Sequence, residues 1–155
     1  MGKSKQWIFV TLGALLTIGA HFLPWVATSS LAGASQHSAI EMIKTSFLEG
    51  GALIYSGIAI LLGAVMMAVI LILGLTSMRT CEKPNCPTVP VIVLSLLSAV
   101  GMFAGLFLMK GYYAKINALQ EVNYQIGPAL GYYLSFAGIA IILLGMLTGS
   151  SKRAS

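Results

Sequence analysis

The chain has 155 residues, of which 57% are hydrophobic and only 8% charged, and its mean hydropathy is +0.90. Soluble domains carry about 25% charged residues, so this composition excludes an ordinary soluble domain and indicates an integral membrane protein. The net charge of +5 does not indicate a nucleic-acid-binding protein, because the basic residues flank apolar runs. Basic residues in that position set membrane topology and contact anionic lipid headgroups.

Four uncharged apolar runs make up about half of the chain, namely residues 7–23, 51–75, 89–109 and 130–147. At 1.5 Å per residue, a helix over 51–75 would reach roughly 37 Å, more than the ~30 Å hydrocarbon core of a bilayer. The remaining residues are too few and too scattered for a separate soluble domain. We therefore predict a single all-α membrane domain over residues 1–155, a bundle of four transmembrane helices.

The charges predict how the chain crosses the membrane. One side holds six basic residues and one acid: Lys3, Lys5, Arg79, Lys83, Lys152, Arg153 and Glu82. The other side holds three of each: Lys44, Lys110, Lys115, Glu41, Glu49 and Glu121. By the positive-inside rule both termini and the loop 76–88 are cytoplasmic, which predicts a multi-pass protein of the plasma or inner membrane with an uncleaved first helix.

The first run begins and ends at aromatic residues. Trp7 opens it, and Pro24 and Trp25 close it, since proline disfavours helix at the preceding residue. Tryptophan is enriched at headgroup depth, so Trp7 and Trp25 are predicted to mark the two membrane interfaces. His21, in the last turn, is expected to be hydrated or hydrogen-bonded rather than a ligand.

The loop after the first run contains a predicted short helix. Residues 38–48 place Ile40, Ile43 and Phe47 on one helical face, and Ser38 followed three residues later by Glu41 has the pattern of a capping box. We predict a short amphipathic helix on the external side. Two interpretations stay open for it: a lid over the ends of the other helices, or a docking surface for a partner.

Small residues recur on the second, third and fourth runs. Small residues let helix backbones approach closely in lipid. The predicted helix-packing residues are Gly51, Gly57, Gly63, Gly101, Gly105, Gly138 and Gly145. The pattern does not tell contact within one chain from dimerisation. The similar segments 57–63 and 138–145 suggest a parallel internal repeat, with coincidence as the alternative.

The chain's two cysteines, Cys81 and Cys86, lie in the predicted cytoplasmic loop. A zinc site usually needs a shorter spacing and two further ligands. A thiol oxidoreductase would place the pair on the oxidising side of the membrane. Incidental reduced thiols, a regulatory disulfide and a metal site all remain open, with Cys81 and Cys86 kept as a candidate redox pair.

The third run is expected either to continue outward as a helix or to break near Gly111. Tyrosines gather around this outer end, where an aromatic belt and a ligand-stacking surface are both open interpretations. The predicted partner surface joins the helix in the first loop to this region and comprises Ile40, Ile43, Phe47, Tyr112, Tyr113 and Tyr124. Gly127 and Pro128 are expected to turn the chain into the fourth run.

No Asp, Glu, Lys or Arg lies inside any of the four runs. Proton-coupled transporters and membrane enzymes commonly need such a residue at membrane depth. We therefore expect a non-enzymatic protein with no catalytic residues, metal or cofactor, either an accessory or scaffold subunit of a larger membrane complex or a self-associating tetraspan. Its expected partners are the lipid bilayer and other membrane subunits or a second copy, and no nucleic acid.

Two other functions stay open. One is a small transporter or channel for an uncharged or lipid-like solute, whose cavity would be lined by Ser56, Ser95, Ser98 and Ser135. The other is a thiol-dependent redox protein. Claudin-like tetraspans resemble the chain in having a longer first external loop, but it lacks their Gly-Leu-Trp-Cys-Cys segment and an external cysteine pair, so no family is assigned.

Overall fold

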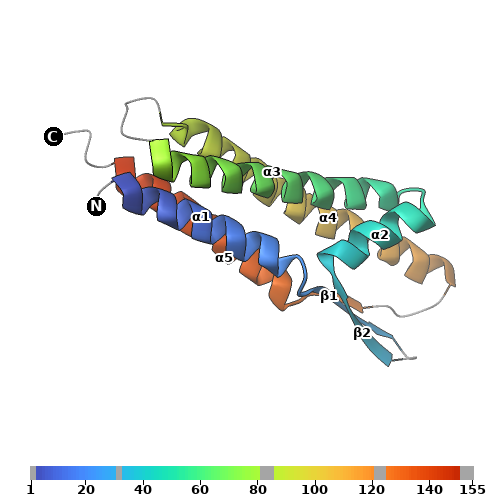
Figure 1. Ribbon diagram of the computed structural model, residues 1–155. Coiled ribbons are helices and arrows are strands. Elements are labelled where there is room, and N and C mark those ends of the chain that lie inside the picture. Colours follow the sequence, from blue (N-terminus) through green and yellow to red (C-terminus); the bar gives the residue numbers. More distant parts are fainter. Residues whose placement is uncertain (1–2, 31–32, 81–85, 121–124, 151–155) are drawn as a thin grey trace.

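The computed structural model describes residues 3–30, 33–80, 86–120 and 125–150, which form five helices and a three-stranded sheet (Figure 1). In chain order the elements are α1 (Lys3–Ala20), β1 (Pro24–Ser30), β2 (Gly33–Ser38), α2 (Ala39–Glu49), α3 (Leu53–Thr80), α4 (Thr88–Gln120), β3 (Gln125–Pro128) and α5 (Leu130–Ser150). Most of the described chain is helical, as predicted. The prediction of an all-α protein is wrong, because it did not include the sheet.

Three helices are long and apolar enough to cross a membrane. Their apolar segments are Leu53–Met78 of α3, Thr88–Leu119 of α4 and Leu130–Thr148 of α5. The apolar part of α1, Lys5–Ala20, falls short of that length. These helices support a membrane location, and the fourth predicted span is not among them.

One prediction about local structure is confirmed, and for the outer end of α4 the structure shows one of the two expected alternatives. The helix α2 starts with the predicted capping box, in which the Ser38 hydroxyl accepts from the Glu41 N–H at 3.2 Å and the Glu41 carboxylate accepts from the Ser38 N–H at 2.9 Å. The helix α4 does not break near Gly111 but continues to Gln120, and its 33 residues reach roughly 50 Å. That length exceeds the ~30 Å hydrocarbon core of a bilayer, so in a membrane part of α4 would lie outside the core.

The long helices lie side by side, with the described chain ends at one end of the bundle and the sheet at the other (Figure 1). Among the helices, the most extensive contacts are those of α1 with α5 and of α3 with α4, followed by α1 with α3 and α2 with α3. A parallel repeat would exchange α1 with α4 and α3 with α5. The pairs α1–α5 and α4–α3, which would then be equivalent, are similarly extensive, whereas α1–α3 is a much larger contact than its equivalent α4–α5, so the repeat stays a prediction.

The outside of the bundle is apolar. Large hydrophobic side chains such as Leu62, Ile72, Phe103 and Leu144 are exposed along α3, α4 and α5. A soluble monomer rarely exposes apolar area on this scale, whereas a helix surrounded by lipid is expected to. The buried interior is filled by side chains from all four long helices, including Val10, Ile60, Met67, Met102, Ile142 and Met146.

Glycines lie where the long helices come closest. A Cβ placed on Gly101 would be 2.9 Å from the Ala59 carbonyl oxygen, and one on Gly145 would be 2.7 Å from Phe9 Cβ. Gly57, Gly63, Gly105 and Gly138 are similarly crowded by a neighbouring helix, as are Gly13 and Gly74, which were not among the predicted packing residues. Gly51 differs from the other predicted packing residues. It lies between α2 and α3 with a φ of +60° and nothing within 4 Å of its Cβ position.

The sheet joins segments that are distant in sequence. β1 is the central strand and pairs antiparallel with β2 on one side and β3 on the other. Ser35 of β2 lies opposite Thr28, and Thr28 also lies opposite Ile126 of β3. The predicted turn at Gly127 and Pro128 is therefore the end of a strand. We call β1, β2, β3 and α2 together the cap.

Candidate functional site

Trp25, at the start of β1, holds the cap on the helix bundle. Its indole is fully buried and donates a 3.0 Å hydrogen bond to the Ala20 carbonyl at the end of α1. The ring packs edge-on against Tyr132 of α5 at 5.7 Å and lies 4.7 Å from the His21 ring. The Trp25 carbonyl accepts a 2.8 Å hydrogen bond from the Ala129 N–H. One residue thus connects α1, β1 and the start of α5.

The two tryptophans predicted to mark the membrane interfaces are buried within the protein. Trp7 is only 1% exposed and Trp25 is not exposed at all, so both indoles pack against the chain, and their depth in a membrane stays a prediction. The sequence pattern could not separate these cases, because an aromatic residue at a helix end suits both an interface and a buried junction.

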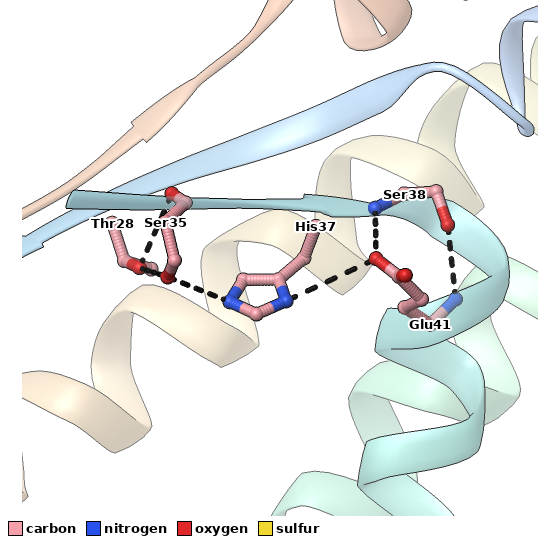
Figure 2. A network of polar contacts seen from close by, with 5 residues as sticks. All are labelled: Thr28, Ser35, His37, Ser38 and Glu41. Atoms are coloured by element: carbon pink, nitrogen blue, oxygen red, sulfur yellow. Dashed lines mark hydrogen bonds and ion pairs between the residues drawn. The ribbon is translucent and has the colours of Figure 1, made fainter.

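A polar network connects β1, β2 and α2 (Figure 2). The hydroxyls of Thr28 and Ser35 are 2.6 Å apart, and the Ser35 hydroxyl is 3.0 Å from His37 Nε2. His37 Nδ1 lies 3.9 Å from the Glu41 carboxylate, which also caps α2 through the backbone of Ser38. These contacts fix the hairpin relative to the first turn of α2.

The order serine, histidine, carboxylate in this network is also that of a catalytic triad, but the geometry differs. At 3.9 Å, Glu41 is beyond hydrogen-bond distance of His37, and its Oε2 atom accepts from the Ser38 N–H instead. Ser35 is exposed on the hairpin and shares its hydroxyl with Thr28. We therefore assign the network to the structure of the cap.

The buried face of α2 differs from the predicted apolar face. Ala39, Met42 and Ser46 are buried. Ser46 packs against Gly57 of α3, and its hydroxyl donates to the Ile43 carbonyl at 2.7 Å. The helix therefore binds α3 through small residues.

Of the predicted partner surface on α2, Ile40 and Phe47 are exposed, together with Leu48, while Ile43 is half-buried. An apolar stripe thus remains on the outer side of this short helix. On α4, Tyr112 and Tyr113 are half-buried and contact each other at 5.6 Å, edge to face.

Tyr113 also lines a cavity of about 50 Å³ beneath the cap, together with Val26, Thr28, His37, Met42, Thr45 and Met109. A space of this size holds a few water molecules at most, and not a substrate. Tyr124 lies outside the described residues. The structure therefore brings two tyrosines of α4 close to the cap and leaves Ile40 and Phe47 facing outward.

The outer edge of β2 is a second exposed feature of the cap. Within the described chain β2 pairs with β1 alone, and residues 33–36 are exposed. The strand carries no formal charge and no proline. Charges and prolines are the usual devices that block pairing at a sheet edge, so the backbone of residues 34–37 is open to another strand.

The four serines proposed to line a solute cavity take part in helix packing. All are fully buried, and each hydroxyl donates to a helix carbonyl: Ser56 to Gly105, Ser98 to Gly63, Ser95 to Val91 and Ser135 to Gly131. The first two bonds join α3 to α4. None of the four serines lines the cavity under the cap.

Cys86 is disulfide-bonded, and the chain's other cysteine, Cys81, lies outside the described residues. A disulfide is typical of an oxidising compartment, whereas the positive-inside rule predicted a cytoplasmic position for this loop. Across the described ranges, no group of three His, Cys, Asp or Glu side chains could hold a metal ion. Comparison with models of protein families, with curated proteins and with solved structures finds no match to the chain.

Proposed function

We propose that the chain is a non-enzymatic, four-span membrane protein that acts as a scaffold or accessory subunit through its cap. The observation that carries this proposal is the combination of an open β2 edge and the exposed Ile40, Phe47 and Leu48 of α2 on one projecting structure. An open edge supplies backbone hydrogen bonds to a partner strand, and the exposed apolar side chains of α2 supply buried area.

Contacts along the whole of α1 support its role as the fourth span. It packs on α5 at Gly145 near its start, at Gly138 in its middle and beside Gly131 at its end. The helix α5 is long enough to cross a membrane. Because α1 packs along α5 over its whole length, α1 would lie at the same depth in the bilayer as α5. The 18 residues of α1 reach roughly 27 Å, close to the ~30 Å core.

The charge distribution supports an external cap. Of the basic residues of the more positive side, Lys3 and Lys5 lie at the start of α1 and Arg79 lies at the end of α3, at the bundle end opposite the cap (Figure 1). The positive-inside rule then gives internal termini and an external cap. An external sheet edge can reach a second copy in the same membrane or a neighbouring subunit.

The test is to determine the oligomeric state and the bound partner proteins of the full chain in its native membrane. The protein is extracted with its surrounding lipid in polymer nanodiscs, and its mass is measured by native mass spectrometry. We expect either a defined homo-oligomer or a stoichiometric membrane partner. A monomer without a partner, at native abundance, would contradict the proposal.

A pair of variants assigns the contact to the cap. Gln36→Lys places a charge on the β2 edge, and Phe47→Ser removes an exposed apolar side chain from α2. Both should reduce the assembled fraction several-fold while the protein stays folded. Leu119→Ser, at an 84% exposed position on the end of α4, is the matched control and should assemble normally. Assembly lost equally in all three variants would place the contact elsewhere.

A further inference from the structure

The pairing of β1 with β3 determines which way the backbone groups of β1 point. The Trp25 carbonyl accepts from the Ala129 N–H, so Trp25 turns toward β3. Val26 lies opposite Pro128, which has no N–H to donate. Successive residues of an antiparallel strand alternate between bonding to one neighbour and bonding to the other. Val26 and Thr28 therefore turn their backbone N–H and C=O groups away from β3 and toward β2.

The same alternation fixes the outer edge of β2. Ser35 and His37 lie opposite the two residues of β1 that turn toward β2, so their backbone groups face β1. Ala34 and Gln36 alternate with them and direct their N–H and C=O groups to the open side of the sheet. Ser38 continues the pattern, because its N–H is not used by β1 and takes part in the capping box of α2. The open edge thus presents a donor and an acceptor at each of two alternate residues.

This edge is complementary to itself. Ala34, Ser35 and Gln36 are small or uncharged and are exposed, and the hairpin of β1 and β2 extends away from the helices (Figure 1). With a two-fold axis at Ser35, Ala34 of each copy lies opposite Gln36 of the other. Because these residues carry the outward groups, each pair exchanges hydrogen bonds in both directions. No like charges meet across the two strands.

The orientation of the two copies fits a single membrane. The sheet face that carries Thr28 and His37 lies toward α2 and α4, because both residues line the small cavity with Met42 and Met109. A two-fold axis that relates two antiparallel edge strands runs perpendicular to the sheet, so this face points the same way in both copies. Both helix bundles then lie on the same side of the joined sheet, as they must when two copies share a bilayer.

We propose that two copies of this chain pair through β2, antiparallel and centred on Ser35, so that their caps form one continuous sheet. The inference rests on the proposed function and specifies it further. The partner is a second copy, and the contact is made by the backbone of Ala34 and Gln36. A strand from a different protein could use the same edge, but it would not bring two Ser35 residues together.

Cysteine cross-linking in native membranes tests this register. In Ser35→Cys the two Cα atoms at the axis would be about 4.5 Å apart, within the range of roughly 4.4–6.8 Å that a disulfide spans. In the matched control Ala34→Cys they would be roughly 8–9 Å apart, beyond that range. We expect mild oxidation to give several-fold more covalent dimer with Ser35→Cys than with Ala34→Cys. The unmodified chain, with its own cysteines, gives the background.

A second pair of variants tests the backbone hydrogen bonds. Gln36→Pro removes one outward N–H from each copy and leaves the groups of Ser35 and His37 that face β1. Combined with Ser35→Cys, it should reduce the cross-linked dimer several-fold. Gln36→Ala keeps the N–H and should leave cross-linking unchanged. Thermal unfolding of the variants shows that the compared proteins are folded.

The outcomes separate this inference from the proposed function. Equal cross-linking at the two cysteine positions, or cross-linking that persists with Gln36→Pro, would overturn the pairing through β2. Native mass spectrometry of the unmodified chain provides the other comparison. A stoichiometric partner of different sequence, or an oligomer without the Ser35→Cys cross-link, would overturn the inference while the proposed function stands. A monomer without a partner would overturn both.

Discussion

The hydroxyl of Ser98 on α4 donates a 2.9 Å hydrogen bond to the backbone carbonyl of Gly63 on α3. The reverse bond runs from Ser56 on α3 to the carbonyl of Gly105 on α4, at 2.7 Å. Both acceptors belong to glycines, whose missing side chains allow the backbones to approach. The pair α3–α4 is thus joined by reciprocal contacts of a kind worth about 0.6 kcal/mol each in membrane bundles. The tight backbone contact around these bonds matters more for stability than the bonds themselves.

Substituting Gly101 tests the importance of this contact. In Gly101→Ala the new Cβ would lie 2.9 Å from the Ala59 carbonyl oxygen, so the helices must separate. We expect a loss of about 1–3 kcal/mol in the free energy of unfolding, measured by titration with a denaturing detergent. The control is Gly111→Ala on the same helix, with nothing within 4 Å, which should gain about 1 kcal/mol from helix propensity. Equal effects would show that α4 does not pack closely at Gly101.

Trp25 offers a test of how the cap is held. Trp25→Phe keeps an aromatic ring but removes the donor to Ala20, so a loss of about 1 kcal/mol is expected. Trp25→Ala leaves a cavity and should lose about 3–5 kcal/mol. Hydrogen exchange should accelerate in β1 and β3 before it does so in α3 and α4. Uniform acceleration throughout the chain would mean that the cap does not open as a separate unit.

The sequence predicted those parts of the fold that depend on local pattern. Apolar runs located α3, α4 and α5, and the spacing of Ser38 and Glu41 located the start of α2. The sheet was missed because its pairing is not local: β1 and β3 are separated by three helices, and β2 consists of small and polar residues. The pattern of residues in β1 or β3 does not indicate that each pairs with a strand about 100 residues away in the sequence.

The candidate sites depend even more on tertiary contacts. Ile40 and Phe47 are exposed because α2 buries the face that carries Met42 and Ser46. The apolar pattern of the sequence did not indicate that this face is the buried one. An apolar groove between α1, α2 and α3 is lined by Ile18 of α1 and Ala64 of α3, which are distant in sequence. Such facts depend on which helices become neighbours, and a single sequence does not contain them.

The link between α2 and α3 gives a prediction about backbone conformation. Gly50 and Gly51 have φ values of +71° and +60°, and such positive-φ conformations cost other residues on the order of 1–3 kcal/mol. Gly50→Ala and Gly51→Ala should each lower the midpoint of thermal unfolding, although neither glycine has an atom within 4 Å of its Cβ position. Gly127→Ala, equally open but without a positive φ, should have little effect. A similar loss in all three variants would exclude backbone strain as the cause.

Two threonines on α1 provide a last, opposed pair of expectations. The buried Thr11 hydroxyl has no hydrogen-bond partner in the described part of the chain, whereas that of Thr17 donates to Gly13 and Ser135. Valine has nearly the same shape as threonine, so the substitution removes the hydroxyl and little else. Thr11→Val should therefore raise the free energy of unfolding by about 1 kcal/mol, because an unpaired polar group leaves the interior. Thr17→Val should lower it by a similar amount and loosen the carbonyl that holds His21. Thermal unfolding of both variants in one detergent decides the matter. If Thr11→Val proved as damaging as Thr17→Val, the Thr11 hydroxyl would have to be paired in the folded protein.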